Sequence, residues 1–247
     1  MSARIPCRAV FLDAGGVIVL PDRDRLAGAL ARAGIDIDPA TVPRAHYLAV
    51  RALDRALDRA LGHAPDRATP ADRTTRADYT RALFPQLGIV PGQTAQAVEV
   101  WERLAHPRRS GAPLWSEPTS GATAAIESLH RAGITVVIVT NSDGHAEENL
   151  AACGFRGIPV VDSTVVGAAK PDARIFHAAL DRAPATPATA VHVGDTLAND
   201  VPGARAAGIT PIHFDPLRAC RARDHRHVRS LAGIRRHIAP LSMTHLL

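Results

Sequence analysis

Four side chains of this 247-residue chain carry groups that could act together on an anionic substrate. Asp13 follows a short apolar run and precedes a glycine pair, Thr140 ends a run of valine and isoleucine, and Asp195 follows Gly194 after another apolar run. The fourth is Lys170, the only lysine among 29 basic residues. Its compact charge on a flexible stem suits contact with a single anionic oxygen, which the rigid fork of arginine matches less well.

These residue types together favour phosphoryl transfer. Carboxylates can hold a hard divalent cation such as Mg²⁺, and one of them can serve as a nucleophile. A hydroxyl and an ammonium group can hold the oxygens of the transferred group as charge builds up on them. Each feature is weak alone, but the ordered set in strand contexts is a strong signal.

Alternating apolar runs and helical patterns after residue 113 predict the elements that position these groups. We expect right-handed β-α-β units and an α/β fold with a doubly wound parallel sheet. Residues at the carboxyl ends of its strands then converge on one crevice, where ligands bind. The expected elements are strand 8–12, helix 120–132, strand 134–140, helix 146–152, strand 158–161, helix 172–182, strand 190–193, helix 201–207, strand 209–214 and a last helix around 227–238.

Residues 22–110 have a different character, with long Ala/Leu/Arg stretches at helical spacing and few strand signals. Because one strand precedes this block, it is predicted to be an α-helical domain inserted into the α/β core. The predicted domains are therefore 1–20 with 111–247, and 22–110. Within the insert, Leu53, Leu57 and Leu61 form one stripe, and Arg51 is expected to pair with Asp54.

The four motifs closely resemble those of the haloacid dehalogenase-like hydrolase superfamily, the aspartate-nucleophile phosphatases and their relatives. They are Asp13 in Val10–Val17, Thr140-Asn141, Lys170-Pro171, and Gly194-Asp195 with Asp200. The resemblance covers nearly the whole chain outside the insert, which is similar to the helical cap of that family. It implies that the cap closes over the site and excludes water before chemistry.

By this resemblance Asp13 attacks phosphorus and forms an aspartyl-phosphate, while Thr140, Asn141 and Lys170 bind the phosphate. It also implies a Mg²⁺ cofactor.

The metal ligands that the resemblance implies are Asp13, the backbone carbonyl of Gly15, and Asp195, with Asp200 as a ligand or a support.

One position departs from the family pattern. The phosphatases carry a second aspartate two residues after the nucleophile, which protonates the leaving group, and here that position is Gly15. Loss of a general acid typically costs about 10²–10⁴ in rate. A cap residue or a water could replace it, or the substrate could have a good leaving group. Asp22 and Asp24 are stand-ins by proximity in sequence only.

Three functions remain open. The leading one is a Mg²⁺-dependent phosphatase of a small phosphomonoester. The second is a 2-haloacid dehalogenase, whose halide needs no protonation, although a dense carboxylate cluster would repel its carboxylate substrate. The third is a catalytically weak phospholigand-binding protein, which Gly15 motivates. A dinucleotide-binding enzyme is excluded because no G-x-G-x-x-G turn follows the first strand.

A small phosphorylated metabolite is the expected partner, and a mildly positive surface suits it. The net charge is +5, but the arginines are scattered without aromatic interleaving, so we expect no nucleic acid. No run approaches the ~18 apolar residues of a membrane span, and no signal peptide is recognised. Three distant cysteines without a C-x-x-C pair argue against disulfides and zinc, and favour the cytoplasm. A monomer or homodimer is expected.

The twelve histidines were also weighed as metal ligands. A spacing of two at the start of a helix puts His225 and His227 on different faces, so both are predicted to be surface residues. His46, Tyr47 and Arg51 lie in the insert and could face the substrate, although such residues are more often solvated or packed against a neighbouring helix.

Overall fold

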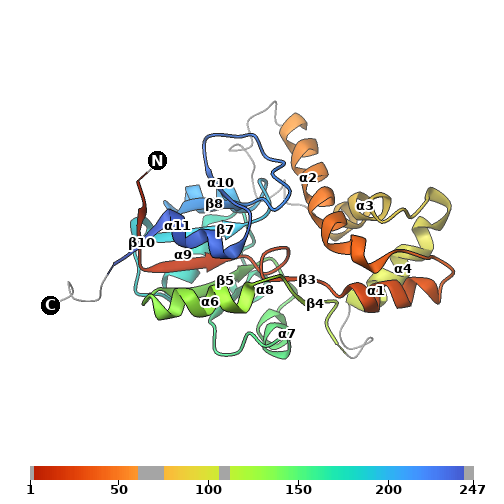
Figure 1. Cartoon of the computed structure of the whole chain (residues 1–247), viewed down its shortest axis with the longest axis horizontal. Coiled ribbons are helices and arrows are strands. Elements are labelled where there is room, and N and C mark those ends of the chain that lie inside the picture. The colour runs from red at the N-terminus through yellow and green to blue at the C-terminus, as the bar shows by residue number, and fades with distance from the viewer. Residues whose placement is uncertain (1–2, 61–74, 106–111, 242–247) are drawn as a thin grey trace.

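The computed structural model describes residues 3–60, 75–105 and 112–241, and its central feature is a six-stranded parallel sheet (Figure 1). Apolar β-branched runs form the inner strands, as expected for a parallel sheet that is covered on both faces. In spatial order the strands are β6 (Val160–Asp162), β5 (Thr135–Thr140), β2 (Ala9–Leu12), β7 (Ala190–Gly194), β8 (Thr210–Phe214) and β9 (Arg226–Val228).

Two apolar clusters cover the two faces of this sheet. Alternate residues of β2 enter different clusters, with Val10 and Leu12 on one side and Phe11 on the other, because successive side chains of a strand point to opposite faces. The first cluster includes residues of α6 (Ala122–Arg131) and α7 (Ala146–Ala152), and the second includes α9 (Ala173–Leu180) and α10 (Asp200–Ala206). The predicted doubly wound α/β core is confirmed.

The helical insert has an apolar core of its own. Its elements are α1 (Arg23–Ala31), η1 (Pro39–Thr41), α2 (Val42–Ala60), α3 (Arg76–Gln86), η4 (Pro91–Gln93) and α4 (Thr94–Ala105). Leu26, Leu83 and Trp101 are among the residues of their shared cluster. Figure 1 shows these helices gathered at one end of the molecule, away from the sheet.

Two short strands connect the insert to the core. β3 (Val19–Pro21) and β4 (Trp115–Pro118) pair antiparallel where the chain enters and leaves the insert. The exact domain boundaries stay a prediction, and residues 110 and 111 lie outside the described ranges, as does Leu61 of the predicted leucine stripe.

The predicted helix over 227–238 is wrong. That segment contains β9, η6 (Leu231–Gly233), the short helix α11 (Ile234–His237) and β10 (Ile238–Pro240). Parallel pairing of β9 with β8 fixes its first residues as strand, in a register that joins His213 to His227. β10 pairs with β1 (Ile5–Cys7), so contacts between distant parts of the chain override the local pattern.

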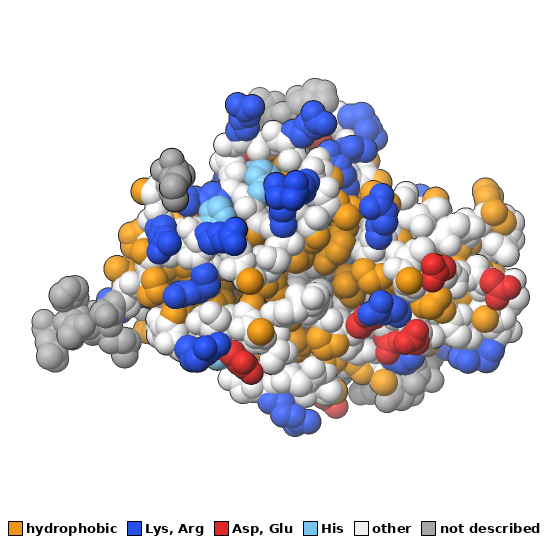
Figure 2. All heavy atoms as spheres, viewed as in Figure 1, with side chains coloured by type: hydrophobic (Ala, Val, Ile, Leu, Met, Phe, Trp, Pro, Cys, Tyr) orange, Lys and Arg blue, Asp and Glu red, His pale blue; other side chains and the backbone are white. Residues whose placement is uncertain are grey.

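Charged side chains are dispersed over the face shown in Figure 2, where Lys and Arg side chains stand over both the core and the insert. Within the described ranges, no helix combines the length and apolarity that crossing a membrane requires.

Candidate active site

The carboxyl edge of the sheet brings the predicted site residues together. Asp13 directly follows β2, Thr140 is the last residue of β5, and Asp195 directly follows β7. With Gly15, Asn141 and Lys170 they line one cleft of about 680 Å³. The seventh predicted residue, Asp200, is placed behind Lys170 and is 2% exposed.

Two carboxylates contact the single lysine and a third lies beside them, and Asp13, Asp195, Asp200 and Lys170 are called the carboxylate cluster below. Lys170 Nζ lies 2.8 Å from Asp13 Oδ2 and 2.7 Å from Asp200 Oδ1. One oxygen of each aspartate lies within 4.8 Å of the others. No member of the cluster is more than 7% exposed, so solvent screens their interactions weakly.

The charges of this cluster do not balance. When all three carboxylates are ionised, one ammonium leaves two negative charges in a buried site, and this state is unfavourable without a cation. Burial raises the pKa of Asp13 to about 8, with Asp195 and Asp200 adding to the rise, while the ion pair with Lys170 opposes it. The neighbouring carboxylates raise the pKa of Lys170 above its usual range, so the lysine stays charged. A divalent cation would restore neutrality.

Both oxygens of Asp200 already have partners. Oδ1 accepts from Lys170 Nζ and from His192 Nε2 at 2.8 Å, and Oδ2 accepts from the backbone N–H and the hydroxyl of Thr196 at 3.0 and 2.6 Å. The charge of Lys170 holds the pKa of Asp200 below its usual range against the effect of burial. Of the two roles predicted for Asp200, this arrangement favours support of Lys170 and of the loop after β7.

Asn141 fixes the backbone of Lys170 from the neighbouring strand end. Its side-chain amide donates to the Lys170 carbonyl at 3.0 Å, and its Oδ1 accepts from the Lys170 N–H at 2.7 Å. The two motifs that are 29 residues apart in sequence are therefore joined by a reciprocal pair of hydrogen bonds. Asn141 therefore positions the lysine through both polar atoms of its side chain.

The insert contributes a histidine to this site. His46, on α2, is 2% exposed, and its Nε2–H donates to Asp195 Oδ2 at 2.9 Å. Because a carboxylate can only accept, Nε2 carries the proton of the neutral ring, and Nδ1 accepts from the Tyr79 hydroxyl at 2.9 Å. Tyr47, from the same helix, donates to the carbonyl of Gly16 at 2.8 Å. Arg51 lies in a smaller pocket beside Asp195 and His213.

Gly15 lies against an indole ring. A Cβ added at Gly15 would stand 3.3 Å from the ring of Trp115, which is a tight contact. The missing carboxylate position is therefore filled by packing. Asp22 does not replace it, because its carboxylate accepts from the Arg25 N–H at 3.0 Å as the N-cap of α1, and Asp24 is exposed in the first turn of that helix.

A second insert carboxylate is docked on the core. Asp54, predicted to pair with Arg51, is instead 9% exposed and accepts from the backbone N–H groups of Leu197 and Ala198 at 2.9 and 3.1 Å. Burial raises its pKa to about 8, although the two N–H groups lower it. The sequence did not predict this contact, the contact of Tyr79 with His46 or that of Trp115 with Gly15. No motif or local spacing in the sequence indicates them.

The comparisons with known proteins agree with this geometry. Residues 7–208 match the family model of haloacid dehalogenase-like hydrolases. The chain is a haloacid dehalogenase-like hydrolase. This hydrolase is 31% identical over 192 residues to haloacid dehalogenase-like hydrolase domain-containing protein 3 of Bos taurus, covering 71% of this chain and 72% of the relative. It is 33% identical over 138 residues to a phosphoserine phosphatase of Thermus thermophilus, covering 55% and 52%.

Solved structures of the superfamily share the fold of this hydrolase. The HAD hydrolase YfnB of Bacillus subtilis, in a magnesium-bound form, has a TM-score of 0.61 at 18% identity, covering 93% of this chain and 97% of that one. A 2-haloacid dehalogenase of Pseudomonas syringae has a TM-score of 0.52 at 22% identity, covering 93% and 97%. The likeness extends over core and insert alike.

Proposed function

We propose that this hydrolase is a Mg²⁺-dependent phosphatase of small phosphomonoesters that works through an aspartyl-phosphate on Asp13. The observation that carries the proposal is the carboxylate cluster, which combines a nucleophile, a buried ammonium and two excess negative charges. The phosphoserine phosphatase among its relatives supports the reaction class.

The residues present fit Mg²⁺. The donors are carboxylate oxygens with a backbone carbonyl nearby, and this hard cation prefers one or two carboxylates, waters and substrate phosphate oxygens. Asp13, Asp195 and the carbonyl of Gly15 would hold it, with Asp200 in support. When bound, the ion would neutralise the excess charge and that of the phosphoryl group.

The chain's own residues would carry the reaction as follows. A carboxylate oxygen of Asp13 attacks phosphorus, and the bond from phosphorus to the leaving oxygen breaks with its electron pair. Lys170 and the hydroxyl of Thr140 hold the equatorial oxygens. Water then cleaves the aspartyl-phosphate, which releases phosphate and regenerates the carboxylate. Asn141 and Asp200 keep Lys170 in place throughout.

The cleft favours a small substrate with an apolar portion. Its volume lies within the range of small-molecule sites. Tyr79, Trp101 and Trp115 line it from the insert and its connecting strand, opposite the polar groups of the sheet edge. Because Gly15 supplies no proton to the leaving oxygen, we expect the highest rates for esters whose leaving group needs little protonation.

A dehalogenase is the second candidate, and Gly15 is the observation that favours it. The same aspartate would displace halide from carbon without a general acid. The two excess negative charges count against it, because a haloacid carboxylate would have to enter an anionic site.

The first experiment is hydrolysis of p-nitrophenyl phosphate by the wild type and Asp13→Asn, with Mg²⁺ or EDTA. We expect Mg²⁺-dependent turnover that falls by at least about 10⁴-fold in the variant. Asp36→Asn, an exposed aspartate of the insert, is the matched control. Metal-independent chloride release from 2-chloropropionate, lost in Asp13→Asn, would establish the dehalogenase instead. Phosphate binding without either turnover would identify a phospholigand-binding protein.

A further inference from the structure

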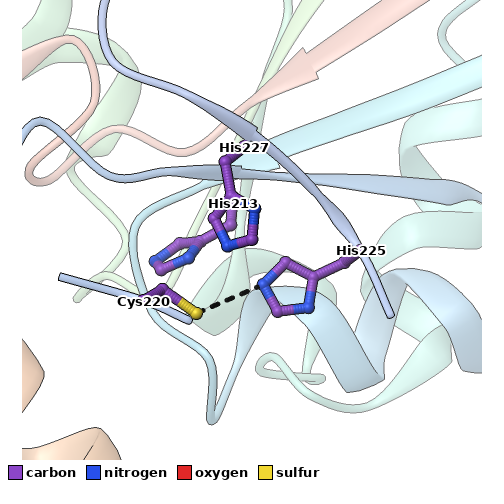
Figure 3. Close-up of side chains that lie close together, drawn as sticks. All are labelled: His213, Cys220, His225 and His227. Atoms are coloured by element: carbon purple, nitrogen blue, oxygen red, sulfur yellow. Dashed lines mark hydrogen bonds between the residues drawn. The ribbon is translucent and has the colours of Figure 1, made fainter. Parts of the chain in front are cut away.

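A second group of ligating side chains lies beside the candidate active site, on β8 and β9, the last two strands of the sheet. His213, Cys220, His225 and His227, called the histidine cluster below, each offer one ligand atom within 4.8 Å of the others. Figure 3 shows the four side chains converging, with Cys220 Sγ 3.7 Å from His225 Nε2. The ring centroids of the three histidines are 4.5 to 5.5 Å apart.

The fold builds this convergence from two strands and a loop. His213 and His227 are direct partners in the parallel pairing of β8 with β9, and His225 immediately precedes β9. Cys220 lies on the loop between the strands. Asp215 holds that loop, because its carboxylate accepts from the backbone N–H groups of Ala219 and Cys220 at 2.9 and 2.8 Å.

Neighbouring groups orient the histidine rings. His225 Nδ1–H donates to Asp224 Oδ1 at 2.9 Å, so its Nε2 lone pair faces the cysteine. His213 Nε2–H donates to the backbone carbonyl of Asp195 at 3.2 Å, which leaves Nδ1 as its free acceptor. A carboxylate or carbonyl partner on the other ring nitrogen is the usual arrangement around metal-binding histidines.

Two ring nitrogens of the cluster have no partner. His213 Nδ1 and His227 Nε2 are buried and make no hydrogen bond, and His213 is 6% exposed. Buried polar atoms are nearly always paired, so these two point to a missing ligand.

We propose that the histidine cluster is a structural zinc site with one thiolate and three imidazole ligands. Three nitrogens and a sulfur are a donor set that selects zinc over Mg²⁺. Tetrahedral zinc holds such donors about 3.3–3.6 Å apart, so ligand atoms that now lie within 4.8 Å of one another would draw together around the ion. Four protein ligands leave no open position for substrate, which makes the role structural. On binding, zinc replaces the thiol proton of Cys220, which is released to solvent.

The spacing of the cysteines argued against zinc, because the sequence has no paired C-x-x-C motif. The fold supplies the missing ligands by pairing β8 with β9. The site fastens the loop after β8, whose residues Asp215 to Ala219 share a small pocket with Tyr47 and Asp54 of α2. It also lies one hydrogen bond from the backbone of Asp195. Zinc here would steady both the docking surface of the insert and the loop of the proposed Mg²⁺ site.

The test uses the untagged full chain, stripped with a chelator and titrated with ZnCl₂ in excess Mg²⁺. We expect one zinc per chain by mass spectrometry of the metal content. At a zinc concentration 100-fold above Kd, Tm should rise by about 5–10 °C. CoCl₂ in place of zinc should give the strong visible bands of tetrahedral cobalt and a thiolate-to-metal charge-transfer band, whereas an all-oxygen site would give neither.

Variants separate this site from the carboxylate cluster. Cys220→Ser and His225→Ala should lower retained zinc below about 0.1 per chain, while Cys153→Ser and the exposed His130→Ala should match the wild type. Asp13→Asn should keep its zinc. The proposal is overturned if wild-type protein binds no stoichiometric zinc, if Cys220→Ser binds it equally, or if the cobalt protein lacks the thiolate band. None of these readouts depends on phosphatase activity.

Discussion

Two groups of ligating side chains stand close together at the carboxyl edge of one sheet, and they are built on opposite principles. The carboxylate cluster concentrates charge, with three aspartates close together in a buried site and a single lysine paired with two of them. The histidine cluster offers neutral nitrogens and a thiol, and burial lowers the pKa of its rings. The carboxylate cluster therefore suits a hard cation that neutralises its negative charge. The histidine cluster suits a softer metal that is bound by nitrogen and sulfur lone pairs.

Asp195 connects the two groups. Its side chain belongs to the carboxylate cluster and accepts from His46, while its backbone carbonyl accepts from His213. If both proposed metals bind, ligand type and not distance would separate them at this strand end. The substitutions below test this difference between the charged carboxylate cluster and the neutral histidine cluster.

The largest effect is expected from Lys170→Met. Removing the ammonium leaves Asp13 and Asp200 buried without a cation, and breaking a buried ion pair typically costs about 3–5 kcal/mol of the free energy of unfolding. Phosphatase turnover should fall by about 10³-fold or more. Denaturant unfolding in EDTA and p-nitrophenyl phosphate assays measure the two effects.

Arg174→Met is the control for this change, since its ion pair with Asp172 lies on the surface and should leave stability unchanged. His225→Ala in zinc-free protein should cost much less than Lys170→Met, because a lost neutral ring leaves no bare charge. If His225→Ala and Lys170→Met lowered the free energy of unfolding equally, the two clusters would not differ in the way described above.

A smaller effect is expected from His46→Ala, which tests whether the insert belongs to the carboxylate cluster. The histidine orients Asp195 through a 2.9 Å hydrogen bond, and losing such a partner of a metal ligand typically costs about 10–100-fold in metal affinity or activity. The measurement is turnover as a function of Mg²⁺ concentration. Arg44→Ala, an exposed position on the same helix, is the control. Unchanged Mg²⁺ half-saturation and kcat would mean that the core alone orients Asp195.

The last change, Asp54→Asn, acts on the pH dependence of stability, at a carboxylate between the two clusters. Burial raises the pKa of Asp54 from 3.8 to about 8, so the folded protein holds this proton more tightly than the unfolded chain. Its contribution to stability is complete below pH 3.8 and is lost as pH rises through about 8. Over that window the free energy of unfolding falls, because the unfolded chain releases the proton that the folded protein keeps.

Asparagine can accept the same two N–H groups without titrating, so the variant should lose this part of the pH dependence. Tm of both proteins from pH 5 to 8 in EDTA measures it, with exposed Asp36→Asn as the reference. Parallel profiles for wild type and Asp54→Asn would show that the carboxylate is ionised throughout.

The sequence predicted the core and the placement of its site residues because that information is local. Asp13, Thr140 and Asp195 each close an apolar run, and the rule that strand ends converge brings them to one edge. The helical insert followed from the change of periodicity after residue 22. These inferences needed no knowledge of which strands are neighbours.

The histidine cluster could be predicted only by knowing which strands are neighbours in the sheet. A spacing of two puts His225 and His227 on different faces of a helix but on the same face of extended chain, so the wrong helix over 227–238 hid their convergence. His213 joins them only through the pairing of β8 with β9. Asp54 was missed for a similar reason, because its burial depends on how the insert docks against Leu197 and Ala198.

The contact between Gly15 and Trp115 links position 15 to the joint between the core and the insert. Trp115 packs against both the core cluster and the insert cluster, and its ring lies 5.6 Å, centre to centre, from those of His46 and Tyr79. A Cβ at position 15 would stand 3.3 Å from this ring, so the indole would have to move by a few tenths of an ångström to admit one. Because the ring contacts both apolar clusters, a side chain at position 15 would act on the seating of the insert as well as on the chemistry of the site.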